Sequence, residues 1–135
     1  MYMNNNKTID FFMAMKPPTT TFQAKQINWK NKSIFDSAEA KNARDKLEAN
    51  LAKHKLDEPL TGAIRMTAIW CYQTEDENVV GEPKVSKPDL DNMNKLLADS
   101  MTKLKFFKDD SQITTLILEK YWSDVPGIYI KLEQI

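Results

Sequence analysis

Apolar and polar residues alternate along four stretches of the chain, which is the pattern of a strand with one buried face. These stretches are residues 8–15, 62–73, about 112–122 and about 128–134. The second is the most regular, with one face formed by Ile64, Met66, Ala68, Trp70 and Tyr72. The last two are separated only by a turn sequence at 123–127, so the pattern predicts that they form a C-terminal hairpin.

Two other stretches carry apolar residues three and four positions apart, which predicts amphipathic helices. The first covers residues 37–54, with Asp36 or Ser37 as its N-cap and an apolar stripe formed by Ala40, Ala43, Leu47 and Leu51. The second runs from about Leu90 to Lys103, with apolar positions at Met93, Leu96, Leu97, Met101 and Leu104. Residues 19–25 and 74–87 are polar and are expected to be loops.

The mixed order of strands and helices predicts an α/β or α+β fold. We expect a single domain over residues 1–135, with a small mixed β-sheet packed against two main helices. With 135 residues, of which 41% are hydrophobic, the chain can build one modest core.

Composition and charge narrow the class of protein. No apolar run approaches the ~18 residues of a membrane span, and the first residues do not resemble a secretory signal. Cys71 is the single cysteine, which excludes an intrachain disulfide framework and a cysteine-rich zinc site. These features favour a cytoplasmic protein with no membrane association.

The formal net charge is zero, but the lysines are unevenly placed. Residues 1–35 contain five lysines against Asp10 alone, and residues 84–108 contain six lysines against three aspartates. Two basic regions on a neutral chain indicate one side that faces phosphate. The alternative is a scatter of lysines that only keeps the protein soluble.

The acidic residues between positions 87 and 112 carry the clearest chemical signal. The sequence there reads Lys87-Pro88-Asp89-Leu90-Asp91-Asn92-Met93-Asn94-Lys95 and, later, Asp109-Asp110-Ser111-Gln112. Positions i and i+2 of a helix do not face each other, so Asp89 and Asp91 can act together only where the chain enters the helix. Pro88 favours such an entry. The helix advances ~18 Å to residue 103 and residues 104–110 reach roughly 20 Å, so Asp110 returns only if that segment is nearly straight.

Carboxylates in this arrangement suit a hard divalent cation such as Mg²⁺ or Mn²⁺, which activates water in phosphoryl transfer. Lys95 follows Asp91 by one helical turn, so it can stabilise the charge of a phosphate at the same end. The alternative is that the first acids only cap a helix and Asp109-Asp110-Ser111 only forms a turn. An EF-hand calcium loop fits less well, because its glycine and its final glutamate are missing.

The two acidic segments, with Asp99 between them, resemble the signature of the RusA family of Holliday-junction resolvases. Pro17-Pro18, followed by a polar basic segment, resembles the N-terminal region of that family. The resemblance implies a small homodimeric, Mg²⁺-dependent endodeoxyribonuclease of bacteria or their phages. Its substrate would be branched DNA, a four-way junction cut by paired nicks that leave 5′-phosphate ends.

By this resemblance, the metal-binding acids fall on Asp89, Asp91 and Asp110, and the catalytic lysine falls on Lys95. Asp109 and Asn92 are expected to support those residues, and Asp99 to be structural. Lys105 stands where relatives tend to have a glycine that ends the helix, so the turn after the helix is expected to differ.

Phosphate contacts are expected from the lysines of the two basic regions, namely Lys16, Lys25, Lys30, Lys32, Lys84, Lys87, Lys103, Lys105 and Lys108. Phe22 and Trp29 could stack on bases. For Phe106-Phe107, burial in the core or in a dimer contact is favoured over stacking. His54 is expected to be solvated or to face the helix dipole at a helix C-terminus. Two other functions stay open: a non-catalytic DNA-binding module with the same fold, and a metal-dependent nucleotide phosphohydrolase.

Overall fold

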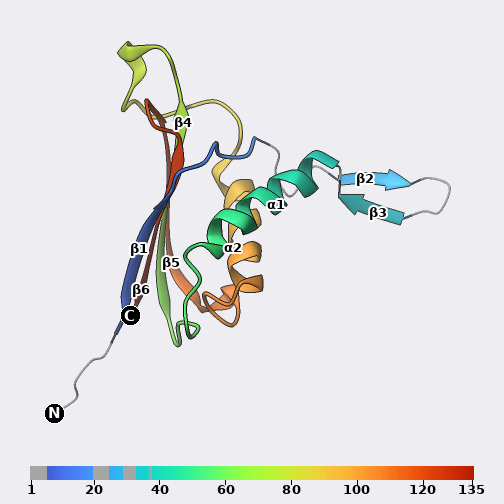
Figure 1. The fold of residues 1–135 in the computed structure, drawn as a ribbon, viewed down its shortest axis with the longest axis vertical. Coiled ribbons are helices and arrows are strands. Elements are labelled where there is room, and N and C mark those ends of the chain that lie inside the picture. Colours follow the sequence, from blue (N-terminus) through green and yellow to red (C-terminus); the bar gives the residue numbers. More distant parts are fainter. Residues whose placement is uncertain (1–5, 20–24, 29–32, 37) are drawn as a thin grey trace.

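In the computed structural model, which describes residues 6–19, 25–28, 33–36 and 38–135, a four-stranded sheet carries two helices on one face (Figure 1). The strands are β1 (Thr8–Met13), β4 (Ile64–Gln73), β5 (Ile113–Ser123) and β6 (Gly127–Gln134). The helices are α1 (Ala38–Ala52) and α2 (Leu90–Lys103). The other described elements are the short 3-10 helices η1 (Glu77–Val79) and η2 (Asp110–Gln112) and a hairpin of β2 (Lys25–Asn28) and β3 (Ser33–Asp36). The predicted mixed sheet with two helices is confirmed.

The sheet has the strand order β1-β6-β4-β5, with β4 and β5 parallel and the other neighbours antiparallel. The predicted C-terminal hairpin is therefore wrong, because β5 and β6 lie on opposite sides of β4. The reason is that α2 connects β4 to β5, and a crossover of this kind returns the chain in its original direction. The reversal at residues 124–126 then places β6 antiparallel to β4, on its other side.

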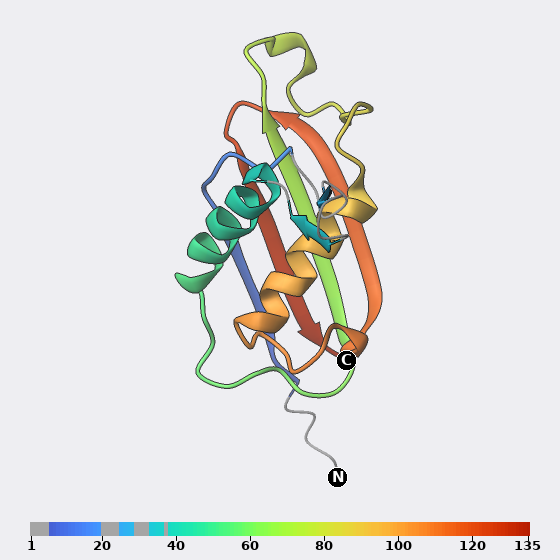
Figure 2. The ribbon, with the colours of Figure 1, turned by 90° about the vertical axis from the view of Figure 1, so that its right-hand side faces the viewer.

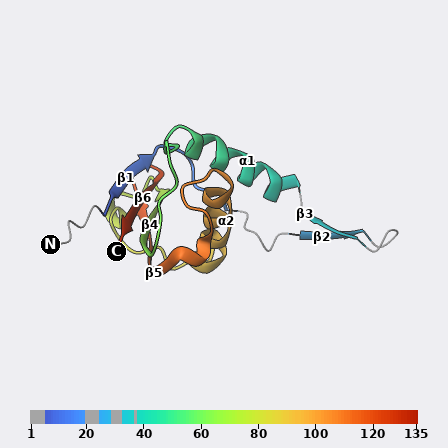
Figure 3. The same ribbon diagram turned by 90° about the horizontal axis from the view of Figure 1, so that it is seen from below.

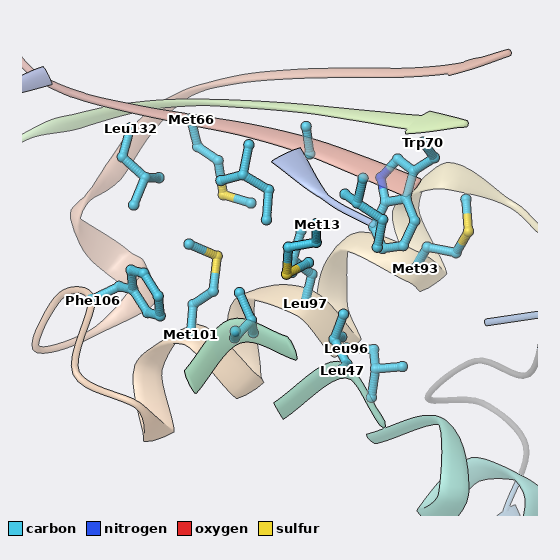
Figure 4. Close-up of a cluster of buried hydrophobic side chains, with 14 of the residues drawn as sticks. Met13, Leu47, Met66, Trp70, Met93, Leu96, Leu97, Met101, Phe106 and Leu132 are labelled. Carbon is cyan, nitrogen blue, oxygen red and sulfur yellow. The ribbon is translucent and has the colours of Figure 1, made fainter. Parts of the chain in front are cut away.

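The core lies between one face of the sheet and the two helices (Figure 4). Its fully buried side chains include Met13, Leu47, Met66, Trp70, Met93, Leu97, Met101 and Leu132. Burying one large apolar side chain stabilises a fold by roughly 1.5–3 kcal/mol. Because α2 contributes several of them, it is held firmly across the sheet, and this fixes where its two ends lie.

The predicted periodicities of β1, β4, β6 and both helices match the observed burial, whereas β5 has no fully buried residue and exposes both Leu116 and Ile117. β4 buries every second residue from Ile64 to Tyr72, and α1 buries the predicted stripe from Ala40 to Leu51. β1 ends at Met13, two residues earlier than predicted, and α1 ends at Ala52 rather than at residue 54.

Phe106 and Phe107 are both fully buried, which confirms burial rather than stacking on DNA. The N–H of Leu60 donates to the carbonyl of Phe106 at 2.8 Å. His54 follows the end of α1, and its half-buried ring stacks on Phe11 with centroids 4.3 Å apart, so it is not fully solvated.

Several predictions concern the region before α1. Residues 20–24, 29–32 and 37 lie outside the described residues, and these include Phe22, Trp29 and the predicted cap Ser37. Lys25, expected in a loop, begins β2 instead, and Asp36 ends β3. Figure 3 shows this hairpin extending past the first turn of α1, away from the sheet. None of the helices in the described ranges is long and apolar enough to cross a bilayer.

Candidate active site

Asp89 and Asp91 lie at the N-terminal end of α2, the upper, yellow end of that helix in Figure 2. Asp89 is the N-cap and has an extended backbone, with φ −76° and ψ 139°, as predicted for a residue that enters the helix. Its carbonyl accepts the N–H of Met93 at 3.1 Å, and its carboxylate lies 3.4 Å from Nζ of Lys87. Both aspartates are exposed at the helix end whose dipole favours negative charge.

Lys95 follows Asp91 by one turn of α2 and precedes Asp99 by another. Burial raises the pKa of the Asp99 carboxyl above its ordinary value; Lys95 lowers this pKa, and Asp110 raises it. Lys95, Asp99 and Asp110 therefore share one electrostatic environment beside the helix. Lys95 stands between the first two acids and the third.

The side chain of Gln112 fixes the turn that follows α2. Its oxygen accepts the N–H groups of Lys108 and Asp109 at 2.9 and 3.0 Å. Its nitrogen donates to the carbonyls of Leu60 and Gly62, both at 3.1 Å. One amide thus ties the turn to the chain segment that leads into β4. Sequence reasoning missed this role of Gln112, although the spacing of Asp109 and Gln112 is that of a capping box.

Asp109 helps to shape the same turn. Its carboxylate accepts the hydroxyl of Ser111, and this bond is the main cause of a lowered pKa for Asp109. Asp110 is the next residue and opens η2. Asp109 therefore shapes the turn that carries Asp110.

The three predicted metal ligands are not gathered in one place. Asp89 and Asp91 lie at one end of α2, while Asp110 follows its other end, and a helix of 14 residues is about 20 Å long. Within the described ranges, no three His, Cys, Asp or Glu side chains lie close enough to hold a metal ion. Carboxylate oxygens suit a hard divalent cation, but one chain does not assemble the full set.

The exit of α2 is left-handed although a lysine stands there. The N–H of Lys105 donates to the carbonyl of Thr102, and the N–H of Phe106 to that of Met101, both at 3.1 Å. This pair of bonds is the Schellman motif. Lys105 has φ +64°, the backbone conformation that glycine adopts most easily. The expected departure from a left-handed exit is therefore wrong.

The lysines predicted to contact phosphate have different surroundings. The exposed ones are Lys16, Lys87, Lys103, Lys105 and Lys108. Lys105 and Lys108 line an open groove of about 770 Å³ beside Asp109. Lys103 is paired with Glu48 at 3.1 Å. Nothing is described of the side chain of Lys25, and Lys30 and Lys32 lie outside the described ranges.

The structure contradicts the prediction that Lys84 contacts phosphate, because this residue is buried, with only 7% relative exposure. Its ammonium donates to the hydroxyl and carbonyl of Ser86 and to the carbonyl of Lys87. Burial, followed by the charge of Lys120, lowers the pKa of Lys84. A side chain committed to these acceptors is not available to a DNA phosphate.

Lys120 is a residue that sequence reasoning missed. Its ammonium donates to the carbonyls of Ser86 and Pro88 at 2.6 and 2.8 Å, just before α2 begins. A signal was present, because Leu118, Lys120 and Trp122 alternate on the same face of β5. A lysine on the face that packs against the helices needs polar partners.

Comparison with known proteins relates this chain to one family of nucleases. The family model described as "Endodeoxyribonuclease RusA" matches residues 16–133. "Crossover junction endodeoxyribonuclease rusA" of Lactococcus phage r1t is 32% identical over 126 residues, which cover 92% of this chain and 95% of that protein. "Uncharacterized protein YqaN" of Bacillus subtilis (strain 168) is 24% identical over 112 residues, or 74% of this chain and 78% of that protein. The range matched by the family model contains both acidic segments.

Proposed function

The chain belongs to the RusA family of endodeoxyribonucleases, and from that premise we propose that it resolves four-way (Holliday) junctions by paired nicking. The observation that carries this proposal is the exposed pair of Asp89 and Asp91 at the start of α2, with Lys95 one turn further on. A relative named as a crossover junction endodeoxyribonuclease aligns with 92% of the chain. The proposed reaction hydrolyses a phosphodiester and leaves 5′-phosphate ends.

Nucleases of this type are generally divalent-metal dependent. We propose Mg²⁺ as the ion, with Mn²⁺ as a substitute, and Asp89, Asp91 and Asp110 as the residues that supply oxygen ligands. One chain does not bring these three carboxylates together, so the full set of ligands would need residues from a second copy. Lys95 would bind a non-bridging oxygen of the scissile phosphate, with Asn92 as a further support.

A second copy of the chain is proposed to complete each site. The acids of one chain form a pair at one end of α2 and a single residue, Asp110, beyond the other end. Two copies that align their α2 helices antiparallel about a two-fold axis would place the partner's Asp110 opposite the Asp89–Asp91 pair. Such a homodimer has two equal sites, and these suit the two opposed strands of a four-way junction.

The exposed lysines near these acids are proposed to contact the DNA backbone. Lys87 lies before the first acids, and Lys105 and Lys108 lie before Asp110, so both ends of α2 carry positive charge. Contacts of this kind release counterions, so junction binding should weaken steeply as salt is added. A DNA substrate places the protein in the cytoplasm of a bacterial or phage-infected cell.

Cleavage of a synthetic four-way junction tests this function. With Mg²⁺ the protein should introduce paired nicks, and with EDTA it should introduce none. Asp89→Asn, Asp91→Asn or Asp110→Asn should each slow nicking by roughly a hundredfold or more, because a bound divalent ion contributes several kcal/mol. Junction binding, measured by gel shift, should persist in all three variants.

Asp124→Asn is the matched control, because Asp124 is exposed in the turn between β5 and β6 and has no proposed role. In the same assay, Lys95→Ala should slow cleavage more than it weakens binding. Nicking at the wild-type rate by any of the three asparagine variants would show that the site is assigned to the wrong residue.

The separation of the acids supports a second candidate function, a DNA-binding module without catalysis. That module would bind the junction equally in Mg²⁺ and EDTA and would leave it uncut. A nucleotide phosphohydrolase is supported less, because Asp89 and Asp91 are exposed at a helix end rather than enclosed around a small substrate.

A further inference from the structure

The segment before α2 pairs with the outer edge of β5 and then leaves it. The N–H of Gly81 donates to the carbonyl of Trp122 at 2.9 Å, and that of Trp122 donates to the carbonyl of Glu82 at 3.0 Å. The N–H of Lys84 donates to the carbonyl of Lys120 at 3.1 Å, and the described pairing ends there. The chain must still cross from the sheet edge to the first residue of α2.

Two lysine side chains hold this crossing segment. Nζ of Lys84 donates to Oγ of Ser86 at 2.8 Å, to the Ser86 carbonyl at 3.3 Å and to the Lys87 carbonyl. Nζ of Lys120 donates to the carbonyls of Ser86 at 2.6 Å and Pro88 at 2.8 Å. Three consecutive carbonyls thus accept from two ammonium groups, and both groups share the first carbonyl. We call Lys84, Lys120 and these carbonyls the lysine clamp.

The clamp lies at the boundary between the interior and the surface, because Lys84 and Pro88 are buried, Lys120 is half-buried and Ser86 is exposed. Nζ of Lys84 lies 5.1 Å from the ring centroid of Tyr72 and 4.9 Å from that of Trp122, so the rings help to stabilise its charge. Two ammonium groups that share an acceptor also repel each other. Two apolar side chains in place of the lysines would avoid this repulsion. The clamp is therefore better explained by its effect on the position of residues 86–88 than by a gain in stability.

The clamp acts on the peptide groups that lead directly into the acidic pair. The carbonyl held by Lys120 belongs to the peptide bond between Pro88 and Asp89, and the ring of Pro88 is buried. Asp89 is the N-cap, so its φ and ψ angles set both the direction of its own carboxylate and the start of the helix that carries Asp91. A rotation of this peptide group would change the distance between the two carboxylates.

We propose that Lys84 and Lys120 are positioning residues that hold the peptide groups before α2 so that Asp89 and Asp91 face the same ligand. This proposal rests on the proposed function, in which the two carboxylates bind a divalent cation. Groups that orient metal ligands typically contribute ~10-fold or more in metal affinity. Loss of a clamp donor should therefore weaken metal binding and leave the sheet intact.

Lys120→Met is the main variant, because methionine keeps the length and removes the donors. Lys120→Arg keeps donors, and Lys131→Met is the matched control on the opposite face of the sheet. Mn²⁺ binding to the DNA-free protein is measured from the electron paramagnetic resonance signal of free Mn²⁺. Lys120→Met should bind Mn²⁺ about tenfold more weakly, Lys120→Arg should recover part of the loss, and Lys131→Met should match the wild type.

A second readout needs neither metal nor cleavage. Hydrogen exchange of the metal-free protein should be faster at residues 85–91 in Lys120→Met and unchanged in the sheet. If Lys120→Met does not fold, Ser86→Ala is a milder replacement, because it removes one acceptor of Lys84. It should show the same faster exchange at residues 85–91. In the cleavage assay, the loss in Lys120→Met should be restored by raising the Mg²⁺ concentration.

The outcomes separate this proposal from the proposed function. If the wild type cuts junctions and Lys120→Met, or Ser86→Ala in its place, shows wild-type exchange and wild-type metal affinity, the clamp proposal is overturned alone. If the wild type neither binds Mn²⁺ nor cuts, the function fails, and the exchange data still decide whether the clamp orders residues 85–91.

Discussion

At the scale of single residues, Tyr72 shows how burial near the candidate site affects stability. The side chain is only 6% exposed, and its hydroxyl donates to the carbonyl of Pro18 at 3.3 Å. Burial raises the pKa of Tyr72 far above its usual range. The folded chain therefore keeps this hydroxyl neutral at a pH at which the unfolded chain ionises it. The stabilisation is complete below a pH of about 10 and is lost as the pH rises above that value.

Tyr72→Phe tests this pH dependence. Near neutral pH, the variant should lose roughly 1 kcal/mol of unfolding free energy, because a hydrogen bond is removed. Above a pH of about 10, the free energy of the wild type should fall faster than that of the variant, by up to about 1.4 kcal/mol per pH unit. Urea unfolding between pH 7 and 11.5 measures both effects. Equal slopes for the two proteins would show that Tyr72 ionises as freely in the folded chain as in the unfolded one.

At the scale of elements, the left-handed exit of α2 carries a strain that a substitution can remove. A residue with a Cβ atom costs roughly 1–2 kcal/mol in the left-handed conformation, and glycine avoids this cost. Glycine also gains entropy in the unfolded chain, which offsets part of the benefit. Lys105→Gly should therefore raise the free energy of unfolding by about 0.5–1 kcal/mol.

Thermal or urea unfolding of Lys105→Gly measures that gain. Lys105→Ala is the control, since it removes the charge and keeps the Cβ atom, and its stability should stay near that of the wild type. A gain of the same size in the alanine variant would assign the effect to charge rather than to backbone conformation.

The elements that could be predicted are those in which buried residues recur at a single regular spacing. β4, α1 and α2 each bury one face, so the spacing of apolar residues gave their type and their inward residues. The neighbours of a strand could not be predicted in this way, because alternation defines a buried face and not the strand beside it. A short turn between β5 and β6 therefore suggested a hairpin, although β4 separates the two strands.

At the scale of the whole molecule, local sequence suggested individual candidate residues for the site but not how they are arranged. Pro88 correctly indicated the extended entry at Asp89. The return of Asp110 along the helix needed a nearly straight segment after α2. Instead, the chain turns at Lys105 and buries Phe106 and Phe107. The residues that remain before Asp110 are too few to run back along the helix. Local sequence could not predict this choice, because it depends on how the aromatic pair packs in the core.

Mixing inactive subunits tests whether two copies build each site. Asp89→Asn and Asp110→Asn subunits should each be inactive alone. If a site combines residues of both copies, a mixed dimer contains one intact site, and an equal mixture that assorts at random recovers about a quarter of the wild-type sites. Nicking of a labelled junction measures the recovery, and native mass spectrometry measures the fraction of mixed dimers.

Asp89→Asn mixed with Asp91→Asn is the matched control, because both changes affect the same end of α2. This mixture should recover nothing, since neither site of the mixed dimer is intact. Mixed dimers of Asp89→Asn and Asp110→Asn that form but do not cut would contradict a shared site.

The position of β6 between β1 and β4 also determines when the sheet can form during biosynthesis. β1 is translated first among the described strands, yet its partner in the sheet is the one translated last, with Thr8 opposite Glu133. While the ribosome is still adding the residues of β6, β1 has no strand beside it and β4 has an open edge. Contacts this distant in sequence are slow to close. A nascent chain should therefore gain its nuclease fold only after β6 has left the exit tunnel, and until then its apolar strands depend on chaperones for protection.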